Sequence, residues 1–292
     1  MAAANLQYDA PPSVWVSFAK AAKPGAVRLR SGQDIPRLEA HLAPAPASTR
    51  TVNKYRKLCG FDANGLLPVT FPHIMAAPLH MAVLTHDAFP LKLLGAVHMR
   101  NAVHQYRALH ENEPLAVHVA VEGHRPVDKG LEFDLQTRIL DTDEQCVWES
   151  TSTNLIRDPA KKSGGGSKGW EPPAWDDFAV VDQWKAPGNI GRRYGVVAGD
   201  VNPIHMHPLA AKLFGFKRAI AHGMWSFASC VARSGGEAIE GACSLDVSFK
   251  RPLFLPGTPE LLSRTVGSEQ TYLLTNPQRS TLYLEGTIQP AG

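Results

Sequence analysis

The segment AGDVNPIHMHP, residues 198–208, brings together residue types that can move protons. Asp200 and His205 are five residues apart. An imidazole titrates near neutral pH, and a neighbouring carboxylate can orient it or hold a shared water. A glycine enters the turn, Pro203 fixes one backbone angle, and the side chain of Asn202 is expected to brace the turn by bonding to the backbone. The segment predicts an acid-base pair held on a stiff turn.

Two other interpretations of these residues stay open at this point. Asp and Asn are ordinary turn and cap residues, so Asp200 can cap a helix that begins near Pro208 while His205 is a packed, neutral side chain. Asp200, His205, His207 and His222 can also be drawn as a metal site, because His and Asp are common ligands. An H-x-H pair alone fixes no coordination geometry, so neither a metal nor a cofactor is expected.

A second segment, AIAHGMW at residues 219–225, supports the chemical interpretation. His222 and Gly223 stand just ahead of an apolar run, 225–233, that is typical of a helix. Unpaired backbone N–H groups at a helix start can bind a negatively charged oxygen, and glycine lets a substrate come close to the backbone. An acid-base pair beside such a site indicates hydration of an α,β-unsaturated acyl group, or the reverse reaction.

The same region resembles a known family. Residues 194–224, YGVVAGDVNPIHMHPLAAKLFGFKRAIAHGM, are similar to the signature of MaoC-like (R)-specific enoyl-thioester hydratases and 3-hydroxyacyl-thioester dehydratases, and SFKRPLFLPG at 248–257 extends the resemblance. The whole chain is similar to double-hotdog members, such as the mycobacterial 3-hydroxyacyl-thioester dehydratases and eukaryotic hydratase 2. The resemblance implies an enzyme of fatty acid metabolism that acts on thioesters of CoA or acyl carrier protein.

The resemblance also implies roles for particular residues. Asp200 and His205 would activate one water for syn addition to the double bond, or run the reverse elimination. Gly223 would offer its N–H to the thioester oxygen. Asn202, Pro203 and His222 would support the site. An acyl-CoA thioesterase and a non-catalytic acyl-thioester-binding protein are the alternatives, because one fold hosts several functions.

The order of elements predicts two related halves. We expect a helix over 72–84 followed by strands at 95–109, 115–123, 131–140 and 146–156, then a helix over 225–233 followed by strands at 243–255, 259–267 and 280–288. YRKLCGF at 55–61 matches YGVVAGD at 194–200 as a tyrosine-glycine turn before each helix. This predicts an α+β double hotdog in which each half wraps a mainly antiparallel sheet around one helix, with the halves joined edge to edge.

These patterns set the expected domains: residues 1–50 as an N-terminal extension, 51–156 as a hotdog without the motif, 157–175 as a Gly/Ser/Pro/Lys-rich linker, and 176–292 as the catalytic hotdog. The acyl chain is expected to lie along the first helix near Met75 and Met81, where Pro78 would loosen the helix. Lys250 and Arg251 are expected to meet phosphates of the carrier, although a solvated basic face is an equal alternative.

Composition excludes several other classes of protein. A formal charge of +3 over 292 residues gives no reason to expect nucleic acid, and no segment is apolar for long enough to span a membrane. Four scattered cysteines suit buried thiols in a reducing compartment, so we expect a cytoplasmic protein. The histidines at 98, 104, 110, 118 and 124 are expected to be packed or solvent-exposed side chains. A homodimer is neither required nor excluded.

Overall fold

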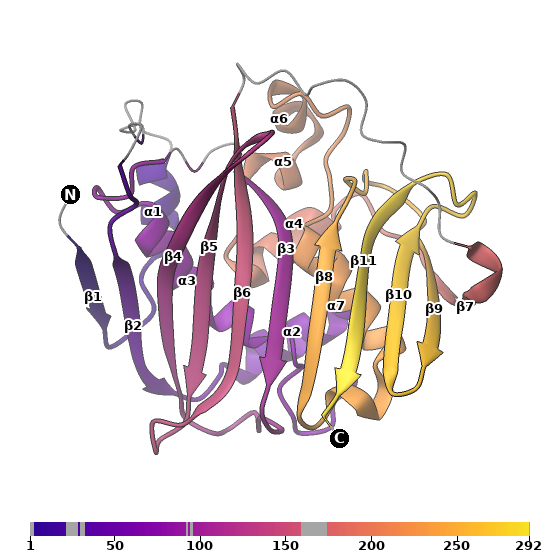
Figure 1. Ribbon diagram of the computed structural model, residues 1–292, viewed down its shortest axis with the longest axis horizontal. Helices are drawn as coiled ribbons and strands as arrows, with labels where there is room; N and C mark the ends of the chain where they lie inside the picture. Colours follow the sequence, from indigo (N-terminus) through magenta and orange to yellow (C-terminus); the bar gives the residue numbers. More distant parts are fainter. Residues whose placement is uncertain are drawn as a thin grey trace.

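The structure, a computed structural model, describes residues 3–21, 29, 33–91, 93, 96–158 and 174–291. Within these residues one sheet of eleven strands runs across the molecule in the order β1-β2-β4-β5-β6-β3-β8-β11-β10-β9-β7 (Figure 1). The pair β1–β2 is parallel, and the other neighbouring pairs are antiparallel. The strands are β1 (Ala4–Tyr8), β2 (Leu38–Ala45), β3 (Ala96–Gln105), β4 (Leu115–Val127), β5 (Gly130–Leu140), β6 (Cys146–Arg157), β7 (Ala179–Gln183), β8 (Cys243–Phe249), β9 (Glu260–Val266), β10 (Glu269–Thr275) and β11 (Leu282–Pro290).

The helices that accompany the sheet cover one of its faces (Figure 1). Apolar residues alternate along the strands and turn toward these helices, as in β2, where Leu38, Ala40 and Leu42 are buried and the residues between them are not. The helices are α1 (Val14–Ala21), α2 (Thr49–Cys59), α3 (Pro72–Leu84), α4 (Ile190–Ala198), α5 (Pro203–Met206), α6 (Pro208–Leu213) and α7 (Gly223–Ser234), with short 3-10 helices η1 (Trp175–Asp177) and η2 (Gly236–Ile239).

The two halves join where β3 pairs with β8. The pairing is antiparallel and runs from Arg100 opposite Ser248 to Gln105 opposite Cys243. It turns two exposed strand edges into one continuous ladder, so the expected edge-to-edge junction is confirmed. Buried residues of both halves form one shared hydrophobic core.

The internal repeat is real, but its tyrosine-glycine segments are helices instead of simple turns. Tyr55 lies in α2 and Tyr194 in α4, and both side chains are buried with ring centroids 6.1 Å apart. Gly60 and Gly199 end these helices in the left-handed conformation, with φ of 95° and 69°. A left-handed residue after the last turn is a common helix end and favours glycine, which explains the shared Tyr and Gly.

The expected central helices are confirmed, whereas β8 is shorter than predicted and β1, β2, β7 and β10 were not predicted. Helix α3 spans the predicted range, and α7 begins two residues earlier than predicted, at Gly223. Strand β8 ends at Phe249, well before residue 255, because the N–H groups of Lys250 and Arg251 both turn to the carbonyl of Tyr283. Strand β10 was not predicted, although the two residues between β9 and β10 include Gly267, a hairpin signal.

Two of the predicted segments, the N-terminal extension and the linker, can be compared with the structure. Strands β1 and β2 come from the expected N-terminal extension, and β2 pairs with β4 at the edge of the first half. Most of the expected linker, residues 159–173, lies outside the described residues. None of the described helices is long and apolar enough to cross a membrane. All four cysteines are free, and Cys59, Cys230 and Cys243 are buried.

Candidate active site

The turn that carries Asp200 is built from a helix end followed at once by a helix start. Gly199 ends α4, and the Asp200 side chain accepts a hydrogen bond from the backbone N–H of Asn202 at 3.2 Å. The Asn202 side chain accepts in turn from the N–H of Ile204 at 3.3 Å and caps α5, where Pro203 is the first helical residue. The expected bracing of the turn by Asn202 is therefore present.

His205 lies in α5 with its ring buried. Its Nδ1 atom is 2.9 Å from the carbonyl oxygen of Ile220. Because a carbonyl oxygen only accepts, Nδ1 carries the hydrogen. The neutral ring then has its free lone pair on Nε2, which is the form that can accept a proton.

His222 connects this turn to helix α7. It is the residue before the helix, and its Nε2 atom donates to the backbone carbonyl of Asp200 at 3.0 Å and lies 3.6 Å from the carboxylate Oδ2. Its ring stacks on that of His205, with centroids 3.7 Å apart and planes inclined by 24°. One carboxylate oxygen and one ring nitrogen of each histidine lie within 4.8 Å of one another. The tertiary structure thus brings together the three residues that the two motifs supplied.

The interpretation of Asp200 as a cap for the helix near Pro208 is wrong. Helix α6 is capped by His207, whose Nδ1 accepts from the N–H of Leu209 at 3.2 Å. The metal interpretation is not decided by the geometry, since the three ligating atoms at Asp200, His205 and His222 are close enough to share an ion. The absence of a metal stays a prediction.

Two glycines that the motif search passed over set the position of the acid-base pair. A Cβ atom on Gly191 would lie 2.2 Å from the carbonyl oxygen of His205, and one on Gly195 would lie 2.5 Å from that of Asp200. Both glycines belong to α4 and are one helical turn apart, so they face the same side. Only a helix face without side chains lets the backbone of the Asp200–His205 turn approach so closely. The spacing of four between them was the signal in the sequence.

Gly223 opens helix α7, where the first backbone N–H groups have no partner within the helix. The space that a Cβ atom would occupy there faces the ring of Phe249, whose nearest carbon would be 2.9 Å away. The close approach that requires glycine in this structure is therefore made by Phe249 of β8. The approach of a substrate to the backbone N–H of Gly223 stays a prediction.

Electrostatics of the site favour an ionised carboxylate between neutral imidazoles. Burial raises the pKa of Asp200, but the rings of His222 and His205 and the N–H of Asn202 outweigh burial and hold the pKa below its usual value. Burial lowers the pKa of His205, against the opposing effects of Asp200 and the Ile220 carbonyl. Burial, with the ring of His205, lowers the pKa of His222 to about 3. The site therefore carries one negative charge and two neutral rings near pH 7.

The first half adds buried histidines beside the second-half motif. His98 of β3 packs against Phe249 with centroids 5.1 Å apart and lies near enough to Asp200 for the carboxylate to raise its pKa. Burial dominates and lowers the pKa of His98 to about 4. His73 and His80 of α3 continue this group, with centroids 5.1 Å apart. Sequence position gave no sign that His98, which precedes the linker in the chain, reaches the motif that follows the linker.

The expected substrate-binding residues are dispersed. Lys250 forms an ion pair with Glu285 at 2.7 Å, and Arg251 is exposed. Met75 and Met81 are half-buried on α3, and their contact with an acyl chain stays a prediction. A cavity of about 290 Å³ lies beside the same helix, and its walls include Ile74, Pro78, Val14, Ala198 and Gly199. Gly199 in its wall is the residue before Asp200, and neither Met75 nor Met81 is among the residues that line it.

Comparisons with known proteins agree with this geometry. Residues 189–272 match the family described as MaoC like domain. This region is a MaoC-like domain. The 3-hydroxyacyl-thioester dehydratase X of Mycobacterium tuberculosis (strain ATCC 25618 / H37Rv) is similar to the chain, with 29% identity over 260 residues that cover 87% of this chain and 90% of that protein. The Asp200 turn and the His222 helix start both lie inside the MaoC-like domain.

Solved structures extend the likeness beyond the MaoC-like domain. The crystal structure of HtdX from M. tuberculosis superposes with a TM-score of 0.75 at 28% identity and covers 87% of this chain and all (100%) of that one. A M. tuberculosis protein described as a double hotdog has a TM-score of 0.57 at 9% identity, covering 85% of this chain and 94% of its own, which shows the fold alone. The chain has the predicted α+β double hotdog fold.

Proposed function

We propose that this protein adds water reversibly to trans-2-enoyl thioesters and forms (R)-3-hydroxyacyl thioesters. The observation that carries the proposal is the meeting of Asp200, His205 and the start of helix α7 within one MaoC-like domain. A relative that is 29% identical over most of both chains is named a 3-hydroxyacyl-thioester dehydratase, which supports the same reaction class. The proposal includes thioesters of CoA and of acyl carrier protein as substrates.

The spacing of the two acceptors suits one water molecule. Two acceptors that each bond a tetrahedral water at about 2.8 Å stand roughly 4.6 Å apart. The carboxylate oxygen of Asp200 and a ring nitrogen of His205 lie within 4.8 Å of each other. A water between them donates one O–H to each acceptor, so its lone pairs point away from both and toward a bound double bond.

His205 and Asp200 account for every proton transfer in the reaction. The water oxygen bonds to the β-carbon of the enoyl chain while Nε2 of His205 takes one of its protons. The imidazolium formed is stabilised by the neighbouring carboxylate of Asp200. The electron pair of the double bond moves onto the thioester oxygen, and the α-carbon then takes the proton back from His205. Because one water supplies both parts from one side, the addition is syn.

The transient oxyanion needs donors that are already in place. The N–H of Gly223 and its neighbours at the start of α7 are free of intrahelical partners, and the helix dipole favours negative charge there. His222 does not need to touch the substrate in this scheme. Its bond to the Asp200 carbonyl ties the acid-base turn to the same helix start, so it acts as a positioning residue.

The test measures both products of incubation with crotonyl-CoA. Wild-type protein is expected to form 3-hydroxybutyryl-CoA without releasing free CoA. Asp200→Asn and His205→Gln are each expected to lower kcat by roughly 10²-fold to 10⁴-fold, the usual contribution of a positioned acid or base. His207→Gln is the matched control, since this exposed histidine of the same motif caps α6 and should keep turnover near wild type.

Three outcomes contradict the proposal. Release of free CoA that depends on Asp200 would establish a thioesterase. Wild-type rates in both variants would leave the protein as an acyl-thioester binder whose motif has no chemical role. Loss of turnover on treatment with a chelator, restored by a divalent metal in the wild type and equally in a His41→Gln/His118→Gln variant, would show that Asp200, His205 and His222 hold an ion instead of a water.

A further inference from the structure

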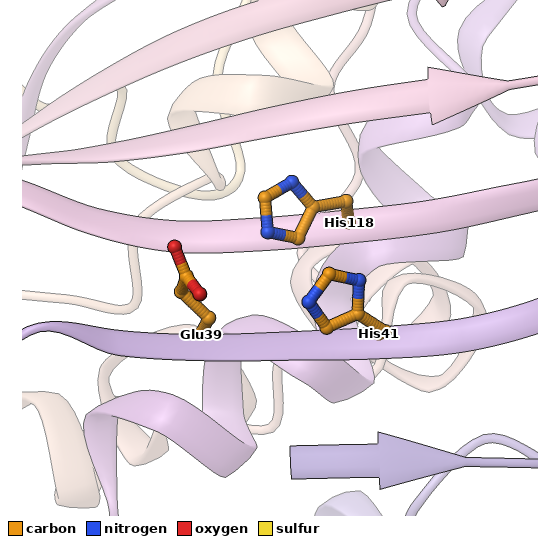
Figure 2. A group of neighbouring side chains, drawn as sticks. All are labelled: Glu39, His41 and His118. Carbon is orange, nitrogen blue, oxygen red and sulfur yellow. The ribbon is translucent and has the colours of Figure 1, made fainter. Parts of the chain in front are cut away.

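A second group of ligating side chains lies far from the active site, at the edge of the first half. Glu39 and His41 are on β2 and His118 is on β4, all on the face of the sheet that the helices leave uncovered. Figure 2 shows a nitrogen of each imidazole and the carboxylate of Glu39 pointing into the same small space. Neither the MaoC-like domain nor the proposed reaction uses these residues.

Strand geometry explains why the three side chains meet. Residues two apart on a strand point to the same face, which places Glu39 beside His41. His41 and His118 are directly opposite each other in the β2–β4 register, where side chains of paired strands are nearest. Their rings stack with centroids 4.2 Å apart and planes inclined by 17°. One carboxylate oxygen and one nitrogen of each ring lie within 4.8 Å of one another.

The hydrogen bonds and ion pairs of His118 and Glu39 also leave both side chains able to bind a ligand. The Nε2 atom of His118 is buried without a hydrogen-bond partner. Such an atom is costly unless something binds it. Glu39 is already paired with Arg37 at 2.6 Å, but the Arg37 side chain is 78% exposed, so this pair is weak and easily displaced.

Besides the Arg37 guanidinium, a second positive charge near the site opposes a cation. Arg138 of β5 lies opposite His118 in the β4–β5 register. Its guanidinium pairs with Glu149 of β6 at 3.5 Å, which directs the positive charge to the far side and partly neutralises it. The carboxylate of Glu39, 15% exposed, has an oxygen within 4.8 Å of a nitrogen of each ring and favours a cation between them.

We propose that Glu39, His41 and His118 form a binding site for a divalent transition metal ion such as zinc. Two imidazoles and one carboxylate are a known zinc ligand set, and the fourth position on this face stays open to water. Imidazole donors select zinc and its first-row neighbours over magnesium and calcium, which prefer oxygen ligands.

The position of the site gives the ion a structural role. It bridges β2 to β4, so it holds the N-terminal segment against the first half through more than backbone pairing. The same segment supplies α1, where a Cγ atom of Val14 lies 3.2 Å from the space that a Cβ of Gly199 would fill. The ion therefore stabilises a segment that packs beside the Asp200 turn.

The test is titration of the full chain with zinc chloride by calorimetry after dialysis against a chelator. We expect one site with a Kd in the micromolar range or tighter, weakened at least tenfold by His41→Gln and by His118→Gln. His104→Gln is the matched control, because His104 lies on the same face of β3 but is bound to Ser244 at 2.7 Å instead of a second histidine. Thermal unfolding with and without zinc should show stabilisation in the wild type and in the control.

Two results would overturn the site. Equal zinc affinity in the wild type and in the His41→Gln/His118→Gln double variant would place binding elsewhere. Loss of zinc binding in His205→Gln, with His41→Gln unaffected, would assign the ion to the active-site histidines. Circular dichroism of each metal-free variant separates lost binding from lost folding, and the hydratase assay reports independently on the proposed function.

Discussion

Replacing Gly191 of α4 by alanine should slow catalysis without a change in any reacting group. The added Cβ would lie 2.2 Å from the carbonyl oxygen of His205. A carbon and an oxygen in ordinary contact are about 3.3 Å apart, so the backbone of His205 must move by roughly 1 Å. A misplacement of this size can cost about 100-fold in rate, which corresponds to about 2.7 kcal/mol in the barrier.

The net loss of folding free energy, about 0 to 2 kcal/mol, should be smaller than the increase in the barrier. Overpacking costs about 1 to 3 kcal/mol, whereas alanine recovers up to about 1 kcal/mol of helix propensity relative to glycine. Gly195→Ala should behave similarly, because its Cβ would meet the Asp200 carbonyl oxygen at 2.5 Å. Gly188→Ala is the matched control just before α4, since its Cβ would meet only Pro256 at 3.7 Å.

The assay follows the loss of enoyl absorbance on hydration of crotonyl-CoA, with kcat and KM determined for the three variants and the wild type. Urea unfolding of the same samples gives the free energy of unfolding. Wild-type kcat in a folded Gly191→Ala protein would refute the reasoning, because it would mean that the position of His205 is not critical. A fall in kcat in Gly188→Ala as large as that in Gly191→Ala would also refute it.

Three further predictions concern stability and binding. The pKa of buried His80 is lowered from 6.5 to about 3, so the unfolded chain binds a proton that the folded chain does not, and stability falls as the pH drops below 6.5. Between about pH 7.5 and about pH 5.5 the free energy of unfolding, measured with urea, should therefore fall by about 1.4 kcal/mol less in His80→Gln than in the wild type. An equal fall in both proteins would contradict the assignment. Arg233 donates to the Cys59 carbonyl at 3.0 Å across the two halves, and Arg233→Ala should lower the free energy of unfolding by about 2 to 3 kcal/mol in the same experiment. Arg251→Ala should raise KM for a CoA thioester roughly threefold to fivefold and leave KM for a pantetheine thioester unchanged. Lys250→Ala should have a smaller effect on KM for the CoA thioester. An equal rise in KM for both substrates would exclude a contact between Arg251 and a phosphate.

Local signals account for the parts of the fold that could be predicted. Asp200, Asn202 and Pro203 form a turn through bonds to residues at most two positions away, so their types and spacing already specify it. An apolar run that follows His222 and Gly223 predicts helix α7. The repeat of Tyr and Gly was visible, but two matching residues do not distinguish a turn from a helix that ends at a left-handed glycine.

The sequence by itself determined the braced turn, the two-half plan and the candidates for the reacting groups, because each depends on neighbours along the chain. Tertiary structure alone decided which nitrogen of His205 is free, since the Ile220 carbonyl that fixes it is fifteen residues away. It also placed His98 of the first half near Asp200. Contacts between distant strands and helices depend on register and on the packing of the whole core, and no local spacing encodes them.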